Sequence, residues 1–430
     1  MKKLVNLCLW LVLFVLTIGQ IQAQSFEKQL ATLDGVSGIE KLKSDVYADK
    51  YLVRINQLID PKHPEVGTFT QRVIVAHVGY DRPTVIVTEG YGAAYALNPR
   101  YQEELCRLFN ANMVFVEYRY FLESTPNPCN WDYLTAENSA YDLHHVNQVF
   151  HKLYKGKWIS TGISKGGQTT TLYRAFFPND VDFSVPYVAP LNRGVEDGRH
   201  EPFIDNDGSK GVRKMIRNFQ IEILKRKTEV VPMLNAYCKE KGWEFRMPMP
   251  EVLDYCVLEY PFAFWQWGTN PNKIPSLSSD TKTLFDHLVS ISEPNNFAEG
   301  QAYISFFVQA ARELGYYGYD TKPFEKYLTI KSSKGYLNRI MLPKDLVGKV
   351  EFRPELYNKV YNFLKDNDPK MIFIYGEYDP WSATRVPTFK GKINEQIYIK
   401  PGGSHASRIS NMPEAIKKKI IDQITQWLSE

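Results

Sequence analysis

Gly162-Ile163-Ser164-Lys165-Gly166 lies directly after an apolar run at residues 158–161 and before residues 167–173, which have the pattern of a helix. A serine flanked by two glycines, on a turn from a strand into a helix, can hold its hydroxyl exposed because glycine tolerates the crowded backbone. This arrangement is a nucleophile elbow. We therefore expect Ser164 to be a nucleophile, and a glycine-rich turn with an incidental serine is the alternative.

An elbow serine needs a histidine that takes its proton and an acid that orients the histidine, and these follow in the order serine, acid, histidine. Asp379 comes just after the apolar run at residues 371–375, and His405 comes just after the next such run. An open parallel sheet builds its site where its strands end. We predict a triad of Ser164, Asp379 and His405. Glu377, two residues before Asp379, is the rival acid.

Short apolar segments alternate with helical patterns along the chain, which indicates an α/β fold with a mostly parallel sheet covered on both faces. Helices are expected at residues 140–153 and 414–428. The expected strands are an antiparallel leading pair at residues 51–59 and 68–78, then buried runs at 83–88, 112–116, 158–161, 183–188, 371–375 and 396–399.

The strand pattern fades between residues 193 and 356 into helical and aromatic segments with scattered prolines. We interpret this stretch as a large helical cap inserted over the sheet. The core then has two parts, residues 24–192 and 357–430. No Gly/Ser linker or internal repeat divides the chain further.

The tetrahedral intermediate of acyl transfer needs backbone donors where its oxyanion forms. One donor should be the amide of Lys165, which follows the nucleophile. The other should come from a loop after an early strand, and Glu89-Gly90-Tyr91-Gly92 is the glycine-rich loop in that place. We expect Tyr91 to supply it, with Gly92 second; a simple tight turn is the alternative.

Residues 1–23 have the pattern of a secretory signal peptide. Lys2 and Lys3 precede an apolar stretch that is too short to span a membrane, and Ala23 suits cleavage before Gln24. We predict export, either secreted or periplasmic, and the alternative is an uncleaved anchor. No second long apolar run follows, so we expect no membrane contact after the signal peptide is removed.

The charge pattern gives no reason to expect a nucleic-acid partner. The formal net charge of +4 falls to about +2 without Lys2 and Lys3, and the remaining charges are interspersed rather than clustered. No Cys or His group has the spacing of metal ligands, so we expect no metal and no cofactor. The oligomeric state is left open.

Four cysteines remain after the signal peptide, an even number in a chain exported to an oxidising compartment. Of the three possible connectivities we favour the pairing of neighbours in sequence, Cys106 with Cys129 and Cys238 with Cys256. Four buried free thiols are the alternative, because a chain of this size does not need disulfides to fold.

Several segments together resemble one family, the secreted serine tripeptidyl aminopeptidases of the PS-ten type, family S-thirty-seven. These are distant relatives of prolyl carboxypeptidase and dipeptidyl peptidase. The resemblance spans nearly all of the mature chain and implies an α/β-hydrolase fold with a helical cap, no cofactor, and cleavage of peptides near their free N-terminus, with proline near the cut. The segments are residues 71–73, 88–91, 117–121, Glu123-Ser124, the elbow, 375–381 and 402–405.

The resemblance also implies a substrate pocket. Trp381 matches a pocket tryptophan of those relatives. They carry apolar residues four after the nucleophile and three after the histidine, where this chain has Gln168 and Arg408, and a Glu-His-Arg-Tyr segment where this chain has Tyr118. The triad is unaffected by these departures, but the preference for proline is left open.

An aminopeptidase must recognise the ammonium group of its peptide substrate, which requires one or two carboxylates near the cleft. Glu117 at a strand end is one candidate, and Glu196 with Asp197 at the start of the cap is another. The alternative for Glu117 is a structural ion pair with Arg119 or another cation.

These residues predict a serine exopeptidase that acts through an acyl-enzyme. An esterase or lipase with the same triad is the second hypothesis, since it needs only an apolar acyl pocket. A non-catalytic binding protein that kept the fold is the third.

Overall fold

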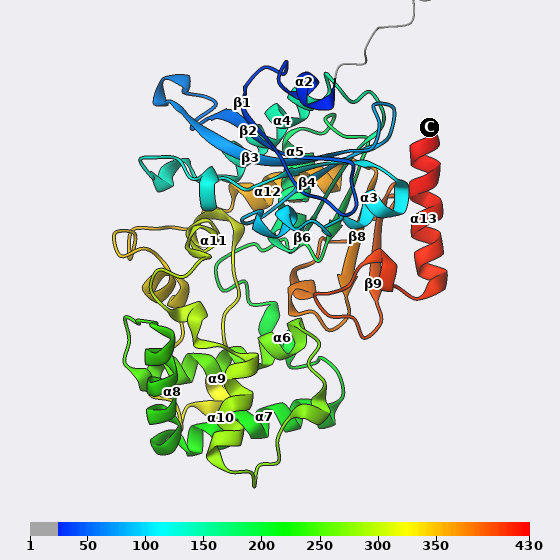
Figure 1. Cartoon of the computed structure of the whole chain (residues 1–430). Coiled ribbons are helices and arrows are strands. Elements are labelled where there is room, and N and C mark those ends of the chain that lie inside the picture. The colour runs from blue at the N-terminus through cyan, green and yellow to red at the C-terminus, as the bar shows by residue number, and fades with distance from the viewer. Residues whose placement is uncertain (1–24) are drawn as a thin grey trace, which may run out of the picture.

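A nine-stranded β-sheet lies at the centre of the computed structural model, which describes residues 25–430 (Figure 1). The sheet has the strand order β1-β2-β3-β5-β4-β6-β7-β8-β9. The first three strands are antiparallel, and β3 also pairs antiparallel with β5. From β5 to β9 all neighbours are parallel. The strands are β1 Val36–Lys41, β2 Asp49–Leu58, β3 Thr68–His77, β4 Thr84–Thr88, β5 Asn112–Val116, β6 Trp158–Ile163, β7 Phe183–Tyr187, β8 Met371–Gly376 and β9 Glu395–Lys400.

The central strands are buried along almost their whole length because each side of the sheet is covered. In β4, Val85 and Val87 pack on one side of the sheet while Ile86 packs on the other. Ile372 and Phe373 of β8 divide in the same way. Continuous apolar runs of this kind are what parallel strands buried on both faces require.

Helices cover both faces of this sheet. One face packs against α2 (Phe26–Leu30), α4 (Ala136–Phe150), α5 (Lys165–Phe176) and α12 (Glu355–Asp366). The other face packs against α3 (Glu104–Phe109) and α13 (Glu414–Ser429). The chain therefore has an α/β-hydrolase fold, as the sequence predicts.

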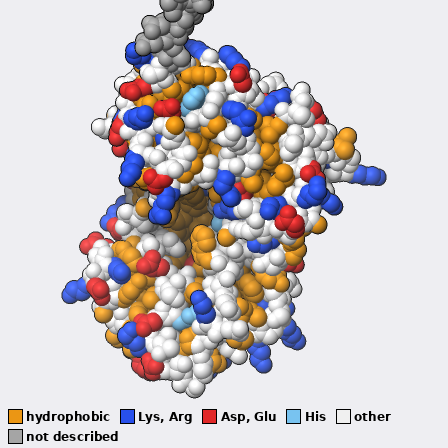
Figure 2. All heavy atoms as spheres, turned by 45° about the vertical axis from the view of Figure 1, so that its right-hand side comes forward, with side chains coloured by type: hydrophobic (Ala, Val, Ile, Leu, Met, Phe, Trp, Pro, Cys, Tyr) orange, Lys and Arg blue, Asp and Glu red, His pale blue; other side chains and the backbone are white. Residues whose placement is uncertain are grey.

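A second, helical lobe lies below the sheet in Figure 1 and has its own apolar core. Within the predicted cap, residues 193–356, this lobe is built from α6 (His200–Ile204), α7 (Lys210–Lys225), α8 (Lys227–Lys241), α9 (Met249–Gln266) and α10 (Thr281–Ile291). The helix α11 (Ile304–Gln309) returns to the sheet, where the hydroxyl of Ser305 donates a hydrogen bond to the carbonyl of Tyr120. Figure 2 shows a hollow between the two lobes with hydrophobic side chains inside it.

The predicted strands and helices agree with the structure to within a few residues, but helices α2, α3 and α12 and one strand were not predicted. The edge strand β1 was not expected, because its residues are exposed or half-buried and follow no apolar alternation. The signal-peptide prediction falls on residues 1–23, which lie outside the described residues. Within residues 25–430, no helix combines the length and the apolar character that a membrane crossing would need.

The predicted disulfide pairing is wrong in this structure, because all four cysteines of the described chain are free thiols. Cys106 is buried in α3 and donates to the carbonyl of Asn112, whereas Cys129 is exposed on a distant loop near Asp345. Cys238 and Cys256 both lie in the apolar core of the helical lobe. Burial raises the pKa of the Cys238 thiol to about 11, so it is protonated at neutral pH.

Candidate active site

Ser164 occupies a strained turn between β6 and α5. Its backbone has a φ of 60° and a ψ of −122°, a region that costs a residue with a side chain about 1–3 kcal/mol. The turn passes so close to β4 that only glycine fits at positions 162 and 166. A Cβ atom on Gly162 would lie 2.6 Å from the carbonyl oxygen of Thr88, and one on Gly166 would lie 2.8 Å from the same atom. The elbow predicted from the sequence has this geometry.

His405 and Asp379 meet at the same edge of the sheet, after β9 and β8. The Nδ1 atom of His405 is 2.7 Å from Oδ2 of Asp379, and both side chains are buried. The other carboxylate oxygen of Asp379 accepts a hydrogen bond from the amide of Trp381. Because Asp379 holds Nδ1, the Nε2 atom of His405 is left to exchange a proton with a nucleophile.

Glu377, the rival acid, is committed elsewhere. Its carboxylate accepts a hydrogen bond of 2.6 Å from the amide of Gly402, in the loop that leads to His405. The structure therefore pairs His405 with Asp379 and uses Glu377 to shape the loop.

The helical lobe also holds His405. The amide of His405 donates a 2.9 Å hydrogen bond to the carbonyl of Gln266, the last residue of α9. The next residue, Trp267, places its ring edge-on to the imidazole, with 5.8 Å between ring centroids. A helix of the inserted lobe thus fixes the loop that carries the histidine, which sequence patterns did not indicate.

Asp207, an acidic residue of the helical lobe, lies close to Asp379. Burial raises the pKa of Asp207 to about 8, and the charges of Asp379 and Glu377 add to that rise. Asp207 is therefore mostly protonated at neutral pH and adds little negative charge beside Asp379. The sequence contains no signal for this proximity.

The loop after β4 lies against the elbow. A Cβ atom on Gly90 would lie 2.6 Å from the amide nitrogen of Gly166, so this position also requires glycine. The amide of Tyr91 donates to the carboxylate of Glu89 at 3.2 Å, and Gly92 packs against Leu122. Without a ligand, the Tyr91 amide that we expected at the oxyanion thus has a partner of its own.

The side chain of Tyr91 lies beside Ser164, and both residues line one small pocket. Burial raises the pKa of the Tyr91 phenol, and a hydrogen bond with Ser164 opposes part of that rise. The phenol is therefore protonated at neutral pH and can donate a hydrogen bond next to the nucleophile.

The Lys165 side chain is buried beneath the elbow. Its Nζ atom donates a 2.7 Å hydrogen bond to the carbonyl of Gly90 and lies 3.1 Å from the ring centroid of Tyr118. Burial lowers the pKa of Lys165 well below its usual value, although Glu89 and Glu313 oppose that shift. This side chain ties the elbow to the Gly90 loop, whereas the sequence suggested a role for the Lys165 amide alone.

A small pocket of about 250 Å³ opens beside Ser164. Gln168 and Trp381 line it as expected, together with Tyr91 and Phe306. The Gln168 side chain donates to the carbonyl of Leu314 at 3.4 Å. The pocket therefore has three aromatic walls, and its two amide side chains, Gln168 and Asn192, both donate to the carbonyl of Leu314.

Arg408 does not line this pocket, so the prediction of a substrate contact is corrected. Its guanidinium turns back and donates to the carbonyls of His405 and Ser407 at 3.0 and 2.7 Å. It also lies over the ring of Tyr187, 5.5 Å from the ring centroid. Arg408 thus braces the loop that carries the histidine.

Glu117 is not free to bind a substrate ammonium, which corrects a second prediction. It is fully buried and forms a bidentate ion pair with Arg72. Its oxygens also accept hydrogen bonds of 2.8 Å from the amide of Ala93 and the hydroxyl of Ser124. Glu117 is a structural residue, although its cation is Arg72 and not Arg119.

The other expected carboxylates at the start of the cap are also occupied. Asp197 is buried, pairs with Arg199 and accepts a hydrogen bond from the amide of Arg193. Glu196 accepts a hydrogen bond from the amide of Gly335.

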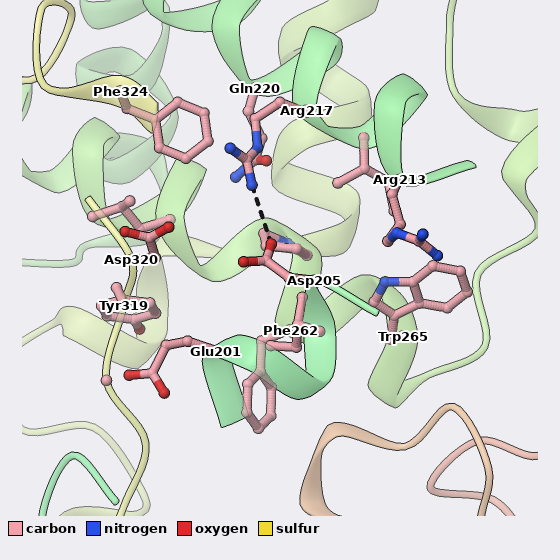
Figure 3. Close-up of a pocket in the computed structure, with 15 residues that line it drawn as sticks. Glu201, Asp205, Arg213, Arg217, Gln220, Phe262, Trp265, Tyr319, Asp320 and Phe324 are labelled. Atoms are coloured by element: carbon pink, nitrogen blue, oxygen red, sulfur yellow. Dashed lines mark hydrogen bonds and ion pairs between the residues drawn. The ribbon is translucent and has the colours of Figure 1, made fainter. Parts of the chain in front are cut away.

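A larger pocket lies in the helical lobe (Figure 3). Glu201 and Asp320 lie beside Tyr319, and Arg213 lies on the other side of the pocket (Figure 3). Asp205 pairs with Arg217 across the pocket at 3.2 Å. In contrast, the Oε2 atom of Glu201 is buried and has no hydrogen-bond partner.

Within residues 25–430, no group of three or more His, Cys, Asp and Glu side chains is arranged to hold a metal ion.

The strained Ser164 follows β6, and the buried pair of Asp379 and His405 follows β8 and β9 of the same sheet, which is the arrangement of an α/β-hydrolase site. The chain belongs to the PS-10 peptidase S37 family, whose model matches residues 20–429. It is thus a serine peptidase, as the resemblance predicts.

Two curated proteins are similar to the chain. A prolyl tri/tetrapeptidyl aminopeptidase of Streptomyces mobaraensis is 30% identical over 413 residues, which cover 93% of this chain and 84% of that protein. A probable serine protease EDA2 of Arabidopsis thaliana is 22% identical over 414 residues, covering 81% of this chain and 82% of that one. Among solved structures, a proline iminopeptidase of Mycobacterium smegmatis covers 87% of this chain and 98% of its own, with 11% identity and a TM-score of 0.38.

The buried pair of Glu117 and Arg72 gives a prediction for stability. Glu117→Gln removes the only buried counter-charge that the described structure gives the Arg72 guanidinium and leaves it the exposed Glu123, so the free energy of unfolding should fall by about 3–5 kcal/mol. Urea denaturation measures it. The matched control is Glu123→Gln, since Glu123 also pairs with Arg72 but is exposed, and its loss should cost less than about 1 kcal/mol. Equal losses in the two variants would contradict the structural role of Glu117.

Proposed function

We propose that this chain is an exported serine aminopeptidase that releases short peptides, chiefly tripeptides, from the free N-terminus of its substrates. The observation that carries the proposal is the 2.7 Å hydrogen bond between His405 and Asp379 at the strand ends next to the Ser164 elbow. The name of the Streptomyces relative, a prolyl tri/tetrapeptidyl aminopeptidase, supports the choice of bond.

In this proposal Ser164 attacks the carbonyl carbon of the bond to be cut, and His405 takes the serine proton through Nε2. Asp379 keeps His405 in the required tautomer and stabilises the imidazolium that forms. His405 then gives the proton to the leaving amine, which leaves the acyl-enzyme. Water attacks this ester with His405 again as base, and the short peptide is released.

The oxyanion of the tetrahedral intermediate would be held at the N-terminus of α5. The amide of Lys165 is the first donor we propose, because it follows the nucleophile at the start of that helix. The second donor comes from the loop at Tyr91 and Gly92. The Tyr91 amide would have to leave Glu89, and the Tyr91 phenol already lies next to Ser164.

A preference for proline before the cut is a part of this proposal. The pocket beside Ser164 offers the rings of Tyr91, Phe306 and Trp381. These aromatic faces suit contact with a small apolar ring, and Arg408 brings no charge into the pocket.

To bind the substrate ammonium, the enzyme needs a carboxylate that does not already have a partner. Glu117 and Asp197 have partners, whereas Glu201 in the larger pocket has an unpaired buried oxygen. Burial raises the pKa of Glu201, and the charges of Glu196, Asp197 and Asp320 add to that rise. An ammonium group in this pocket would supply the missing positive charge.

The two pockets lie next to each other, because an aromatic residue of one contacts an aromatic residue of the other. Phe262 lines the larger pocket and packs edge-to-face on Trp381, with 5.3 Å between ring centroids, while Trp381 lines the pocket of Ser164. Three extended residues span about 10 Å. We propose that a tripeptide bound through its carbonyl at Ser164 places its ammonium at Glu201, which would limit release to short peptides.

Export is proposed from the sequence of residues 1–23, with cleavage near Ala23 and a secreted or periplasmic mature protein.

The direct test of this function is digestion of Ala-Ala-Pro-Leu-Gly-Ala with a free N-terminus, with mass spectrometry of the products. We expect release of Ala-Ala-Pro, and at least a tenfold lower kcat/KM for the N-acetylated peptide, which lacks the charge that a buried carboxylate would bind. Equal rates on the two peptides would contradict the aminopeptidase proposal. Hydrolysis of a short acyl ester alone would favour an esterase.

The role of Glu201 predicts a loss of that discrimination. Glu201→Gln should reduce the ratio of kcat/KM for the free and the acetylated peptide by about tenfold or more, because the amide carries no charge. Asp205→Asn is the matched control, since Asp205 lines the same pocket but already pairs with Arg217. A ratio that Glu201→Gln leaves unchanged would show that the ammonium binds elsewhere.

A further inference from the structure

Trp267 is an exposed tryptophan at the catalytic edge of the molecule. It follows the last residue of α9 and exposes 64% of its surface, whereas Trp265, two residues earlier, exposes 6%. One exposed apolar side chain is ordinary on a protein surface, so exposure alone assigns it no role. Its position does, because the ring lies edge-on to the imidazole of His405.

The backbone around Trp267 is held on both sides. The carbonyl of Gln266 accepts the His405 amide at 2.9 Å, and the amide of Gly268 donates to Trp265 at 3.1 Å. A Cβ atom on Gly268 would lie 3.1 Å from Cβ of Ser404, so this segment touches the histidine loop directly. The indole is therefore presented to solvent from a fixed position and not from a free loop.

The proton transfer from His405 determines which part of the substrate must lie at this position. With Nδ1 bound to Asp379, the proton leaves His405 from Nε2, and its acceptor is the nitrogen of the departing amine. That nitrogen has to come within about 3 Å of Nε2 in the productive complex. The residue to which it belongs is the first one after the cut bond, so its side chain lies beside the imidazole.

We infer that Trp267 forms the binding wall for the side chain of the residue that follows the cut bond, and that it selects apolar side chains, aliphatic or aromatic, at that position. The inference rests on the proposed function, because it requires an amine leaving group of a peptide. The indole contacts the imidazole of His405, which gives its proton to the nitrogen of this residue, and Trp267 still exposes 64% of its surface for a side chain to cover.

Two substrates with the same acyl part separate this role from any other. One is Ala-Ala-Pro-Leu-Gly-Ala, and the other is the amide Ala-Ala-Pro-NH₂, which loses ammonia and has no side chain after the cut. We compare kcat/KM, since it reports the steps up to departure of the leaving group. Trp267→Ala should lower kcat/KM for the leucine peptide about tenfold, the effect of losing an apolar contact, and change that for the amide less than about twofold.

Tyr303→Ala is the matched control. Tyr303 is also an exposed aromatic residue, at 49%, but its ring contacts Tyr91, on the acyl side of the serine. Because both substrates carry the same acyl part, this variant should change their kcat/KM by the same factor. Trp267→Phe should restore most of the activity on the leucine peptide, because it returns an aromatic surface.

The outcomes distinguish the inference from the function on which it rests. If Trp267→Ala slows both substrates equally, Trp267 only supports His405, and the inference is overturned while the function stands. The same holds if neither rate changes. If the wild-type protein cuts neither substrate, the proposed function fails and the inference fails with it.

Discussion

The close approach of the Ser164 turn to strand β4 is the constraint on which the rest of the site depends. Ser164 keeps a positive φ because the backbone must reverse from β6 into α5 within a few residues, at a cost of about 1–3 kcal/mol. Gly162 and Gly166 make that reversal possible, since any side chain there would meet the carbonyl of Thr88. The strands on both sides of β6 hold the turn against relaxation.

That approach also positions the groups around the serine. Gly90 can lie against the elbow only because it has no side chain, and the buried Nζ of Lys165 donates a hydrogen bond to the Gly90 carbonyl. The same geometry brings the Tyr91 phenol next to Ser164. His405 is held by other contacts: its Nδ1 bonds to Asp379, and its amide donates to the carbonyl of Gln266 from the helical lobe. The lobe is therefore part of the catalytic framework and not only a lid.

The sequence predicted what depends on local pattern. Apolar runs marked the buried strands, and the elbow, Asp379 and His405 were recognised because their glycines and strand-end positions are local signals. Partners distant in sequence were not predictable in the same way. Glu117 was expected at a substrate and found in a pair with Arg72, 45 residues away, and Arg408 was expected in a pocket but turns to its own loop. Edge strand β1 has no apolar alternation, and the position of Trp267 beside His405 follows from the packing of two lobes.

The central claim is that Ser164 is the nucleophile and that the Asp379–His405 pair activates it. Reaction with a fluorophosphonate, followed by intact-mass and peptide mass spectrometry, tests it most directly. The account predicts one adduct on Ser164, no adduct in folded Ser164→Ala, and a labelling rate lowered about 10³-fold or more in Asp379→Asn, where the histidine loses its required tautomer. An adduct on another residue, or a folded wild-type protein that does not react, would contradict it.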